Sequence, residues 1–335
     1  MMKIAVDMRM SGKSGIGTFF DELLPYFKES QHEFYFSNPN VKTFSIKEMF
    51  FFPKEELEKI NDCDVYFTPY CNIPGGIKIP VYSTIHDVVF LDVKGLAGKA
   101  GTLIRKFFYK RAVKKSKSIF TVSEFSKERI IANLKCRKNI YVVHNGLPSY
   151  YNNVVPCKEK ENYIIFIGNI KKHKGLSVLL DAFGILLQSR PDVKLMLVGS
   201  NENFRSKDNS IYSKIEKINF HYKDAVTFTG FVQNEELKNL LCKAKLLVQP
   251  SLYEGFGIPP LQALKCGTNA VISDIPVFKE IYGNLPVTFF KSQDSIDLKE
   301  KIAETLDKEF SSDYKEIYSY KNTAESILHI MEFRK

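Results

Sequence analysis

The sequence predicts an α/β protein built from two doubly wound, Rossmann-like domains, each with a parallel sheet. One pattern occurs twice, because residues 3–27 and 163–187 each give an apolar strand, a polar loop that contains glycine, and an amphipathic helix. Such a β-α unit is typical of the start of a doubly wound sheet. The chain has 335 residues, of which 44% are hydrophobic. This length and composition are sufficient for two separate cores.

Further apolar runs bounded by turn residues predict the other strands, because a parallel strand is covered on both faces. They lie at 33–37, 64–68, 80–85, 118–122 and 140–143 in the first half, and at 193–199, 225–229, 246–250, 270–273 and 287–290 in the second. Helical patterns lie between them. Residues 145–162 are rich in turn formers and predict the linker. We therefore expect domains at 1–150 and 151–310, and a final helical segment, 311–335, that packs back onto the first domain.

Membrane-spanning and disulfide-rich classes are disfavoured. No run approaches the roughly 18 apolar residues of a spanning helix. Asp7 and Arg9 stand where a signal peptide would have its apolar core. The six cysteines show no short metal-ligand spacing, which indicates reduced thiols and no zinc site. We expect a cytoplasmic protein.

Three familiar signatures are incomplete. Residues 11–15 contain the Gly-Lys-Ser of a phosphate-binding loop, but Asp7 stands where that motif needs its first glycine. Phe20 replaces the third glycine of a dinucleotide fingerprint, which disfavours a nicotinamide enzyme. Asp62 and Asp64 resemble an Asp-x-Asp metal motif, but they lead directly into a strand, so we interpret them as a polar strand entrance. We expect no metal site.

Several polar residues follow predicted strands, where open α/β sheets bind their ligands. Gly15 and Gly17 follow the first strand, His86 follows 80–85, Lys174 follows the strand that starts near 163, and Glu254 follows 246–250. Two facing sheets would bring these loops to one cleft. Taken singly, His86 is better explained as a structural histidine and Lys174 as a solvated charge, so the functional interpretation depends on the loops converging.

The segment after Glu254 predicts an anion site. Gly255 and Gly257 permit close backbone approach. Pro259 and Pro260 suit the first turn of a helix. A helix N-terminus favours an anion such as phosphate, although a plain strand-to-helix turn remains the alternative.

These motifs carry a family resemblance. The run "PSLYEGFGIPPLQALKCGTNAVISDIPVFKEIYG" resembles the donor-site signature of the retaining glycosyltransferase family of GT-B fold that is numbered four. "SGIGTFF", "TIHDVVF", "TVSEFSKERI", "VVHNGL" and "FIGNIKKHKGLSVLLDAF" are similar to further family motifs in the expected order. The resemblance implies the GT-B fold, with two facing Rossmann-like domains. It also implies an N-terminal acceptor side, a C-terminal nucleotide-sugar site and a final helix that returns to the first domain.

The resemblance also implies roles for single residues. The catalytic set is Glu254 and His86, which contact the transferred sugar, and Lys174, which stabilises the leaving phosphate. The donor-binding set is Gly15, Gly17, Asn169, Lys172, Gly255, Phe256, Gly257, Ile258 and Gln262.

Two positions depart from the family pattern. Gln262 stands where a ribose-binding glutamate is usual, so we expect a neutral ribose contact. Asn169 stands where arginine is frequent, and Lys171, Lys172 or His173 would then supply the phosphate charge.

The acceptor side is predicted from charge. The net charge is +10, and residues 94–120 carry nine Lys and Arg but no acid, interleaved with apolar residues. This pattern predicts a helix on an anionic membrane surface. The residues concerned are Arg105, Lys106, Phe107, Phe108, Lys110, Arg111, Lys114 and Lys115. A solvated helix is the alternative, and no nucleic-acid-binding module is visible.

Together these points predict a cytoplasmic, membrane-peripheral, metal-independent retaining glycosyltransferase. It would use a nucleotide sugar, UDP-sugar favoured, and no other cofactor. It would move one hexose or N-acetylhexosamine to a lipid-linked saccharide of bacterial surface polysaccharide (O-antigen, lipopolysaccharide or capsule). A GDP-mannose-dependent mannosyltransferase, a nucleotide-sugar epimerase of the same fold and a non-catalytic binding protein with a basic surface are the alternatives.

Overall fold

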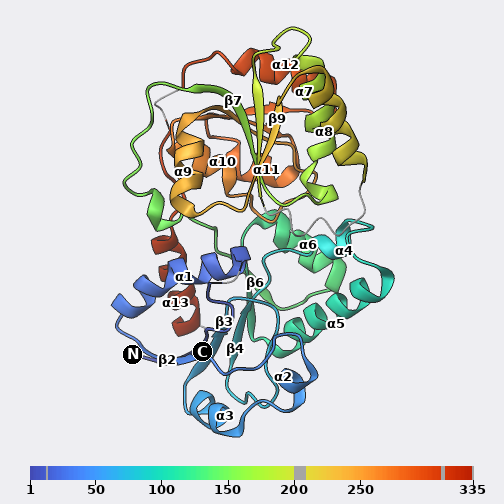
Figure 1. Cartoon of the computed structure of the whole chain (residues 1–335). Helices are drawn as coiled ribbons and strands as arrows, with labels where there is room; N and C mark the ends of the chain where they lie inside the picture. The colour runs from blue at the N-terminus through green and yellow to red at the C-terminus, as the bar shows by residue number, and fades with distance from the viewer. Residues whose placement is uncertain (13, 200–208, 311–313, 334–335) are drawn as a thin grey trace. The chain divides into compact units, whose positions relative to one another are not determined.

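The computed structural model describes residues 1–335 except 13, 200–208, 311–313 and 334–335 (Figure 1). Its contacts define two compact units. Unit 1 comprises Met1–Pro148 with Tyr318–Lys335, and unit 2 comprises Ser149–Ile317.

Unit 1 is built on a parallel six-stranded sheet of order β2-β1-β3-β4-β5-β6. Its strands are β1 (Lys3–Asp7), β2 (Glu33–Ser37), β3 (Val65–Thr68), β4 (Val81–Thr84), β5 (Ser118–Thr121) and β6 (Asn139–Val142). The strand order reverses between β1 and β3, so open α/β sheets of this kind bind ligands beyond the carboxyl ends of these two strands.

Helices cover both faces of this sheet. They are α1 (Ser14–Glu29), α2 (Ile46–Phe50), α3 (Lys54–Asn61), α4 (Val89–Asp92), α5 (Lys99–Lys115), α6 (Glu124–Leu134) and the C-terminal α13 (Tyr320–Phe333). Figure 1 shows α13 beside α1, and the two helices contact each other. Ile327 and Met331 of α13 are fully buried in the same core cluster as Phe20 and Leu23 of α1. The last helix is thus an integral part of the core of unit 1.

Unit 2 contains a second parallel six-stranded sheet, of order β12-β11-β10-β7-β8-β9. Its strands are β7 (Glu161–Ile167), β8 (Lys194–Val198), β9 (Val226–Gly230), β10 (Ala244–Gln249), β11 (Asn269–Ser273) and β12 (Thr288–Phe290). This is the strand order of dinucleotide-binding Rossmann sheets, and its switch point lies between β7 and β10.

The helical elements of unit 2 complete the doubly wound arrangement. They are η1 (Ser149–Tyr151), η2 (Lys172–Lys174), α7 (Leu176–Leu186), α8 (Asn209–His221), α9 (Asn234–Lys243), α10 (Pro259–Lys265), α11 (Pro276–Tyr282) and α12 (Ser295–Thr305). One large core cluster joins the apolar side chains of α7 and α12 to those of β7, β8 and β10. None of the helices in the described ranges combines the length and the hydropathy that crossing a bilayer requires.

The two parallel sheets confirm the predicted fold class, and each predicted strand is present with bounds that differ by at most two residues. The predicted linker region, 145–162, contains η1 and the first residues of β7. No pattern in the sequence singled out α2.

Candidate functional site

Two charged residues meet at the switch point of unit 2. Lys174 ends η2, which follows β7, and Glu254 lies in the loop after β10. Lys174 Nζ lies 2.6 Å from Glu254 Oε1, and the two side chains are 22% and 11% exposed. The pair therefore stands at the edge of the sheet where ligands bind, half-buried and accessible from solvent.

Backbone contacts hold the two loops together around this pair. The Leu252 N–H donates to the His173 carbonyl at 2.7 Å. Gly175 has a φ of +69°, and a Cβ at this position would lie only 1.9 Å from the Pro250 carbonyl oxygen. Only glycine permits that approach. The position of Lys174 is thus fixed by the chain on either side of it.

A buried polar relay orients Glu254. Ser251 Oγ donates to Glu254 Oε1 at 2.7 Å, and Gln249 Nε2 lies 3.0 Å from Ser251 Oγ. The Ser251 carbonyl in turn accepts from Ser273 Oγ of β11 at 2.5 Å. All three supporting side chains are fully buried. Sequence reasoning missed them, although polar residues directly after the apolar run 246–248 were a usable signal.

The glycine-containing loop after Glu254 is closely packed. Gly257 has a φ of +84°, and a Cβ there would lie 2.5 Å from the Phe278 ring. The Gly257 carbonyl accepts a hydrogen bond from Tyr282 Oη. Gly255 is buried and Phe256 is 2% exposed, so the Phe256 ring belongs to the interior. Any contact that Phe256 makes with a ligand must use its backbone.

The helix that follows is a weaker anion site than the sequence predicted. α10 has only seven residues, and it begins with Pro259 and Pro260. Proline has no N–H, so two of the first amide donors are missing. The backbone of Gly257 and of the N-cap residue Ile258 is the remaining source of donors at this end.

Gln262 lies on the second turn of α10 and is 7% exposed. Within the part of the chain that the structure describes, its side-chain amide makes no hydrogen bond to another residue. A nearly buried amide without a protein partner is costly unless a ligand or water satisfies it. This suits the predicted contact with ribose hydroxyls.

One predicted source of phosphate charge is wrong. His173 is 8% exposed, its Nδ1 has no hydrogen-bond partner among the described residues, and burial lowers its pKa to about 4. The ring is therefore neutral near pH 7 and cannot take over the charge of an arginine. Asn169 and Lys172 are exposed on the same loop, so Lys172 remains available for this role.

Gly15 and Gly17 lie in the first turn of α1, directly after the loop from β1. A Cβ on Gly17 would lie 2.4 Å from the Met10 carbonyl oxygen, whereas a Cβ on Gly15 would meet no atom of the described residues within 4 Å. Packing inside unit 1 thus explains Gly17 without a ligand. Gly15 is exposed and has no such structural reason, which leaves it as the better candidate for close approach by a phosphate.

His86 lies after β4 and packs edge-on against the Phe19 ring at 4.9 Å. Its Nε2 lies 2.9 Å from the Pro69 carbonyl oxygen. A carbonyl can only accept, so Nε2 carries the proton and Nδ1 keeps its lone pair. Burial lowers the pKa of His86 to about 4, so the ring is neutral. It can accept a hydrogen bond from a sugar hydroxyl through Nδ1.

The predicted basic helix exists as α5, but its side chains divide between surface and interior. Lys110 and Lys114 are exposed, Lys106 is half-buried, and Phe107 is 54% exposed. Phe108 is 5% exposed, so its prediction as a surface residue is wrong. Its ring packs against the Phe44 ring at 5.0 Å, because the residues on that side of α5 face the core.

Three other cations of α5 make contacts within unit 1. Arg105 stacks on the Phe90 ring, with Cζ 4.1 Å from the ring centroid. Arg111 donates to the Ile73 carbonyl, and Lys115 Nζ lies 3.5 Å from the Pro74 carbonyl. Burial lowers the pKa of both Arg111 and Lys115. Both cations thus contact the protein backbone, although Lys115 remains exposed. The exposed cations of α5 are Lys99, Lys110, Lys114 and Lys115, and Lys106 is half-buried.

Asp62 and Asp64 lie at the opposite edge of the sheet from the glycine loop. Asp62 Oδ2 pairs with Lys3 Nζ at 2.5 Å, and Asp64 Oδ2 accepts from the Lys3 N–H at 2.9 Å. Both carboxylates thus join the starts of β1 and β3. Across the described residues, no group of three or more His, Cys, Asp or Glu side chains has an arrangement that could hold a metal ion.

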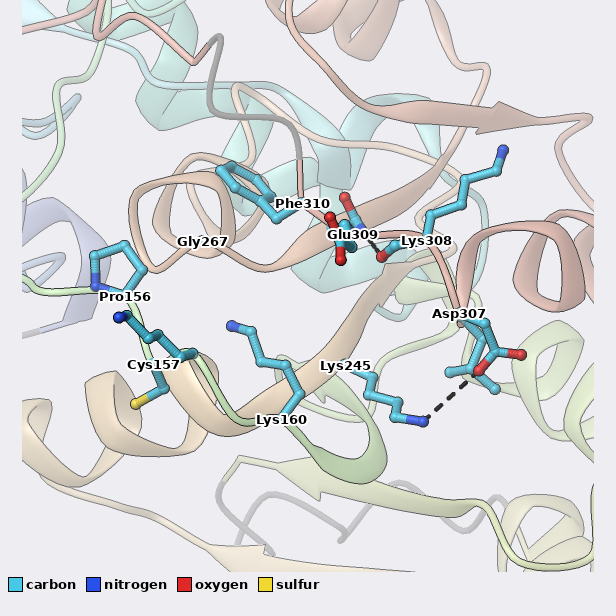
Figure 2. Close-up of a pocket in the computed structure, with 12 residues that line it drawn as sticks. Pro156, Cys157, Lys160, Lys245, Gly267, Asp307, Lys308, Glu309 and Phe310 are labelled. Carbon is cyan, nitrogen blue, oxygen red and sulfur yellow. Dashed lines mark hydrogen bonds and ion pairs between the residues drawn. The ribbon is translucent and has the colours of Figure 1, made fainter.

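Unit 2 also contains a pocket of about 580 Å³ that includes none of the predicted site residues. Figure 2 shows it between the segment that contains Lys160, the turn at Gly267 and the chain around Lys308. Lys160 Nζ donates to the Cys242 carbonyl at 2.7 Å and contacts Thr268 Oγ1 at 3.0 Å. A cation beside the last carbonyls of α9 is favourable, so Lys160 has a structural role there.

The two parallel Rossmann-like sheets define the fold of this protein as GT-B. The lysine and the glutamate lie at the switch point of one of these sheets. Solved structures support the fold. Sucrose-phosphate synthase from Thermosynechococcus elongatus is similar with a TM-score of 0.72, 16% identity and 99% of both chains covered. Alr3699/HepE from Anabaena, in complex with UDP and glucose, is similar with a TM-score of 0.72, 14% identity, and 99% of this chain and 100% of that chain covered.

The family follows from the sequence match. The model for "Glycosyl transferases group 1" matches residues 151–323, more than half of the chain. The chain belongs to this family, and the predicted resemblance to family four is confirmed. The O-antigen chain mannosyltransferase RfbU of Salmonella typhimurium is 33% identical over 180 residues, which are 53% of this chain and 48% of that protein. O-antigen chain mannosyltransferase B of Escherichia coli is 25% identical over 66% of this chain and 59% of its own. The chain thus spans about half to three fifths of these two relatives.

Proposed function

We propose that this chain is a retaining glycosyltransferase that takes one hexose or N-acetylhexosamine from a nucleotide sugar and adds it to a lipid-linked saccharide. The observation that carries the proposal is the ion pair of Lys174 and Glu254 at the switch point of unit 2. It presents a fixed cation and a fixed carboxylate where a Rossmann sheet binds a nucleotide.

The chemistry of the bond requires both charges. Breaking the bond between sugar and diphosphate leaves an anion and an electron-poor anomeric carbon. Lys174 stabilises the leaving phosphate, and Glu254, held by Ser251, favours positive charge at the sugar. The reaction then needs no metal ion, because the protein supplies the cation. We propose front-face displacement, in which the leaving phosphate takes the proton of the acceptor hydroxyl.

Two neutral groups are proposed as contacts of the donor, one in each unit. His86 would accept a hydrogen bond from the sugar through Nδ1, as its tautomer allows. Gln262 would bind the ribose hydroxyls through its side-chain amide, which makes no hydrogen bond to another described residue.

The comparisons support two candidate nucleotide-sugar donors. HepE, which shares the fold, was solved with UDP and glucose, and this supports a UDP-hexose. The two O-antigen relatives are named mannosyltransferases, and this supports mannose, from GDP-mannose, as the second candidate. Gln262, which is neutral where family members have glutamate, does not distinguish the bases because it would contact ribose.

The proposed acceptor side is unit 1. Lys106, Lys110 and Lys114 of α5 would contact an anionic bilayer, on the inner face of the cytoplasmic membrane, where lipid-linked saccharides are assembled. The names of the relatives favour O-antigen as the polysaccharide.

The test is a donor screen without and then with acceptor. The chain is incubated with UDP-glucose, UDP-galactose, UDP-N-acetylglucosamine and GDP-mannose in excess chelator, and nucleotide release is measured. We expect slow hydrolysis of one donor, and faster release with polyprenyl-diphosphate-linked saccharide. The anomeric configuration of the product, read by NMR, should match that of the donor. Recovery of an epimerised sugar without transfer would favour the epimerase, and no turnover or binding of any donor would favour a non-catalytic protein.

A further inference from the structure

The short helix α2 has its polarity reversed. Its one buried residue is Glu48, at 0% exposure, whereas Ile46 and Phe50 are 67% and 73% exposed. Phe51, which follows directly, is 72% exposed. A surface helix of a water-soluble domain normally turns its apolar side chains inward and its charges outward. In α2 the carboxylate faces the core and the aromatic rings face outward.

A buried network fixes this orientation. Glu48 Oε1 lies 2.6 Å from Arg9 Nη1 and 3.1 Å from Tyr70 Oη. Asn72 Nδ2 and the Phe44 N–H donate to Glu48 Oε2. Burial raises the pKa of Glu48, and the charge of Arg9 opposes that shift. If Glu48 left this network, the buried charge of Arg9 would lose one of its partners, and an uncompensated buried charge is costly. The network therefore holds the Glu48 side of α2 against the core.

Phe44 is held in the same outward arrangement. Its φ of +58° lies in the left-handed region, which is rare for an aromatic residue. Its N–H is bound to Glu48 at 2.7 Å, and its ring is 49% exposed while one edge packs on Phe108. We call Phe44, Ile46, Phe50 and Phe51 the α2 ridge.

The α2 ridge adjoins α5. The Gly75 N–H donates to the Glu48 carbonyl at 2.9 Å, so α2 sits on the loop that contains Gly75. Arg111 of α5 binds the Ile73 carbonyl of that same loop. Figure 1 shows α2 close to α5, at the end of unit 1 where α3 also lies. Phe108 of α5 connects the α2 ridge to α5, because its ring contacts Phe44 of the ridge as well as Phe107, its neighbour in α5.

Charge decides what could cover the ridge. Lys42 and Lys47 flank it and are exposed, while its acid, Glu48, is buried and paired. Residues 94–120, which include α5, add nine cations and no acid. Exposed aromatic and aliphatic side chains between lysines are the composition of elements that lie in the interface of an anionic bilayer.

We propose that the α2 ridge inserts into the acyl boundary of an anionic membrane, with Lys42 and Lys47 at the level of the lipid headgroups. The inference rests on the proposed function, because it names the apolar anchor for a surface whose basic part is α5. It adds an element that neither the sequence pattern nor the family match indicated. An acidic protein partner and a second copy of this chain are the competing occupants.

Vesicle binding of the full chain tests the ridge without any substrate. Phe50→Ser/Phe51→Ser should lower partition into vesicles of phosphatidylglycerol and phosphatidylcholine by about 10- to 100-fold, for two partly inserted rings. The matched control is Phe220→Ser, because Phe220 in unit 2 is 86% exposed and far from these elements in the sequence. The control should bind like the wild type. All positions are exposed, so unchanged thermal melting is expected for each variant.

A fluorescent reporter tests insertion directly. The chain contains no tryptophan, so Phe50→Trp introduces its only indole. Emission should shift to the blue with vesicles, and lipids brominated in the acyl chains should quench it. Phe220→Trp should give the same emission with and without vesicles.

Three results would overturn the proposal, and they are distinguishable. Wild-type partition of Phe50→Ser/Phe51→Ser, with lost binding in Lys106→Glu/Lys110→Glu, would leave adhesion by α5 alone. Unchanged emission of Phe50→Trp with vesicles, together with concentration-dependent dimers, would assign the ridge to a second copy. If the emission of Phe50→Trp does not change with vesicles and no dimers form, both the bilayer and a second copy are excluded as occupants. Donor hydrolysis without vesicles should be normal in every ridge variant, so failure of the donor screen is a separate result.

Discussion

Replacement of Lys174 by methionine should separate catalysis from stability. The ion pair with Glu254 is 2.6 Å long, but its side chains are 22% and 11% exposed, so solvent screens it. We expect the free energy of unfolding of unit 2 to fall by about 1 kcal/mol, which corresponds to about 2–4 °C in melting temperature. Glu254 keeps the hydrogen bond from Ser251.

The effect on rate should be much larger. Lys174 would act on charge that develops as the diphosphate leaves, and loss of one such group typically lowers kcat by about 100- to 1000-fold. The assay is nucleotide release from the donor identified in the screen, at saturating donor, with melting followed by circular dichroism. Loss of activity in a variant that is still folded at the assay temperature is the expected outcome.

Lys214→Met is the matched control. Lys214 Nζ lies 2.6 Å from Asp181 Oδ2 in the same unit, but the pair joins α8 to α7 outside the switch point. Its removal should leave kcat unchanged. The role assigned to Lys174 would be refuted if Lys174→Met kept kcat within about threefold of the wild type. It would also be refuted if Lys214→Met lost as much activity as Lys174→Met.

Three further predictions follow from the same geometry. Gln262→Leu should weaken binding of the free nucleotide by about 1–3 kcal/mol, the cost of leaving ribose hydroxyls unsatisfied, while Gln262→Glu should bind at least as well as the wild type. Calorimetric titration measures both affinities. Equal affinity of Gln262→Leu and the wild type would show that the side chain does not contact the ribose. Gly17→Ala should lower the melting temperature, because its Cβ would lie 2.4 Å from a carbonyl oxygen. Gly15→Ala should melt like the wild type and bind the donor more weakly. A Gly17→Ala variant with the melting temperature of the wild type would contradict the close packing at Gly17. Burial lowers the pKa of His173 to about 4, below its unfolded value of about 6.5, so the unfolded chain binds more protons and stability should fall as pH drops through this window. Urea unfolding at pH 7 and pH 5 should show a loss of about 2 kcal/mol from this residue, and His173→Gln should show a correspondingly smaller pH dependence. Equal pH dependence in His173→Gln and the wild type would show that the ring is not desolvated.

The sheets were predictable from the sequence because their physics is local. A parallel strand covered on both faces must be an apolar run of a few residues, and each such run became a strand within two residues of the predicted bounds. The residues at the ends of these strands were predictable for the same reason. Lys174 and Glu254 follow β7 and β10 in the chain, and the strand order then places them together.

Which side chains of the site are buried, and which groups they contact, was decided by contacts between distant parts of the chain. Nothing local distinguishes His173, which is buried and neutral, from its exposed neighbour Lys172. The relay of Gln249 and Ser251 to Glu254 likewise depends on how the loop after β10 turns back on itself. Phe108 and Phe107 are adjacent and chemically identical, yet one faces the core and the other the solvent.

The α2 ridge shows most clearly the difference between what the sequence predicts and what tertiary contacts decide. From the sequence alone, "SIKEMFF" offers a glutamate for the surface and aromatic residues for the core. The tertiary structure reverses this, because Arg9, 39 positions earlier, already lies buried beside Asp7 and gives the carboxylate of Glu48 a partner in the interior. A buried charge is tolerable only where its partner is already in place. The sequence determined which residues are apolar and which are charged, and the fold determined which of them face the solvent.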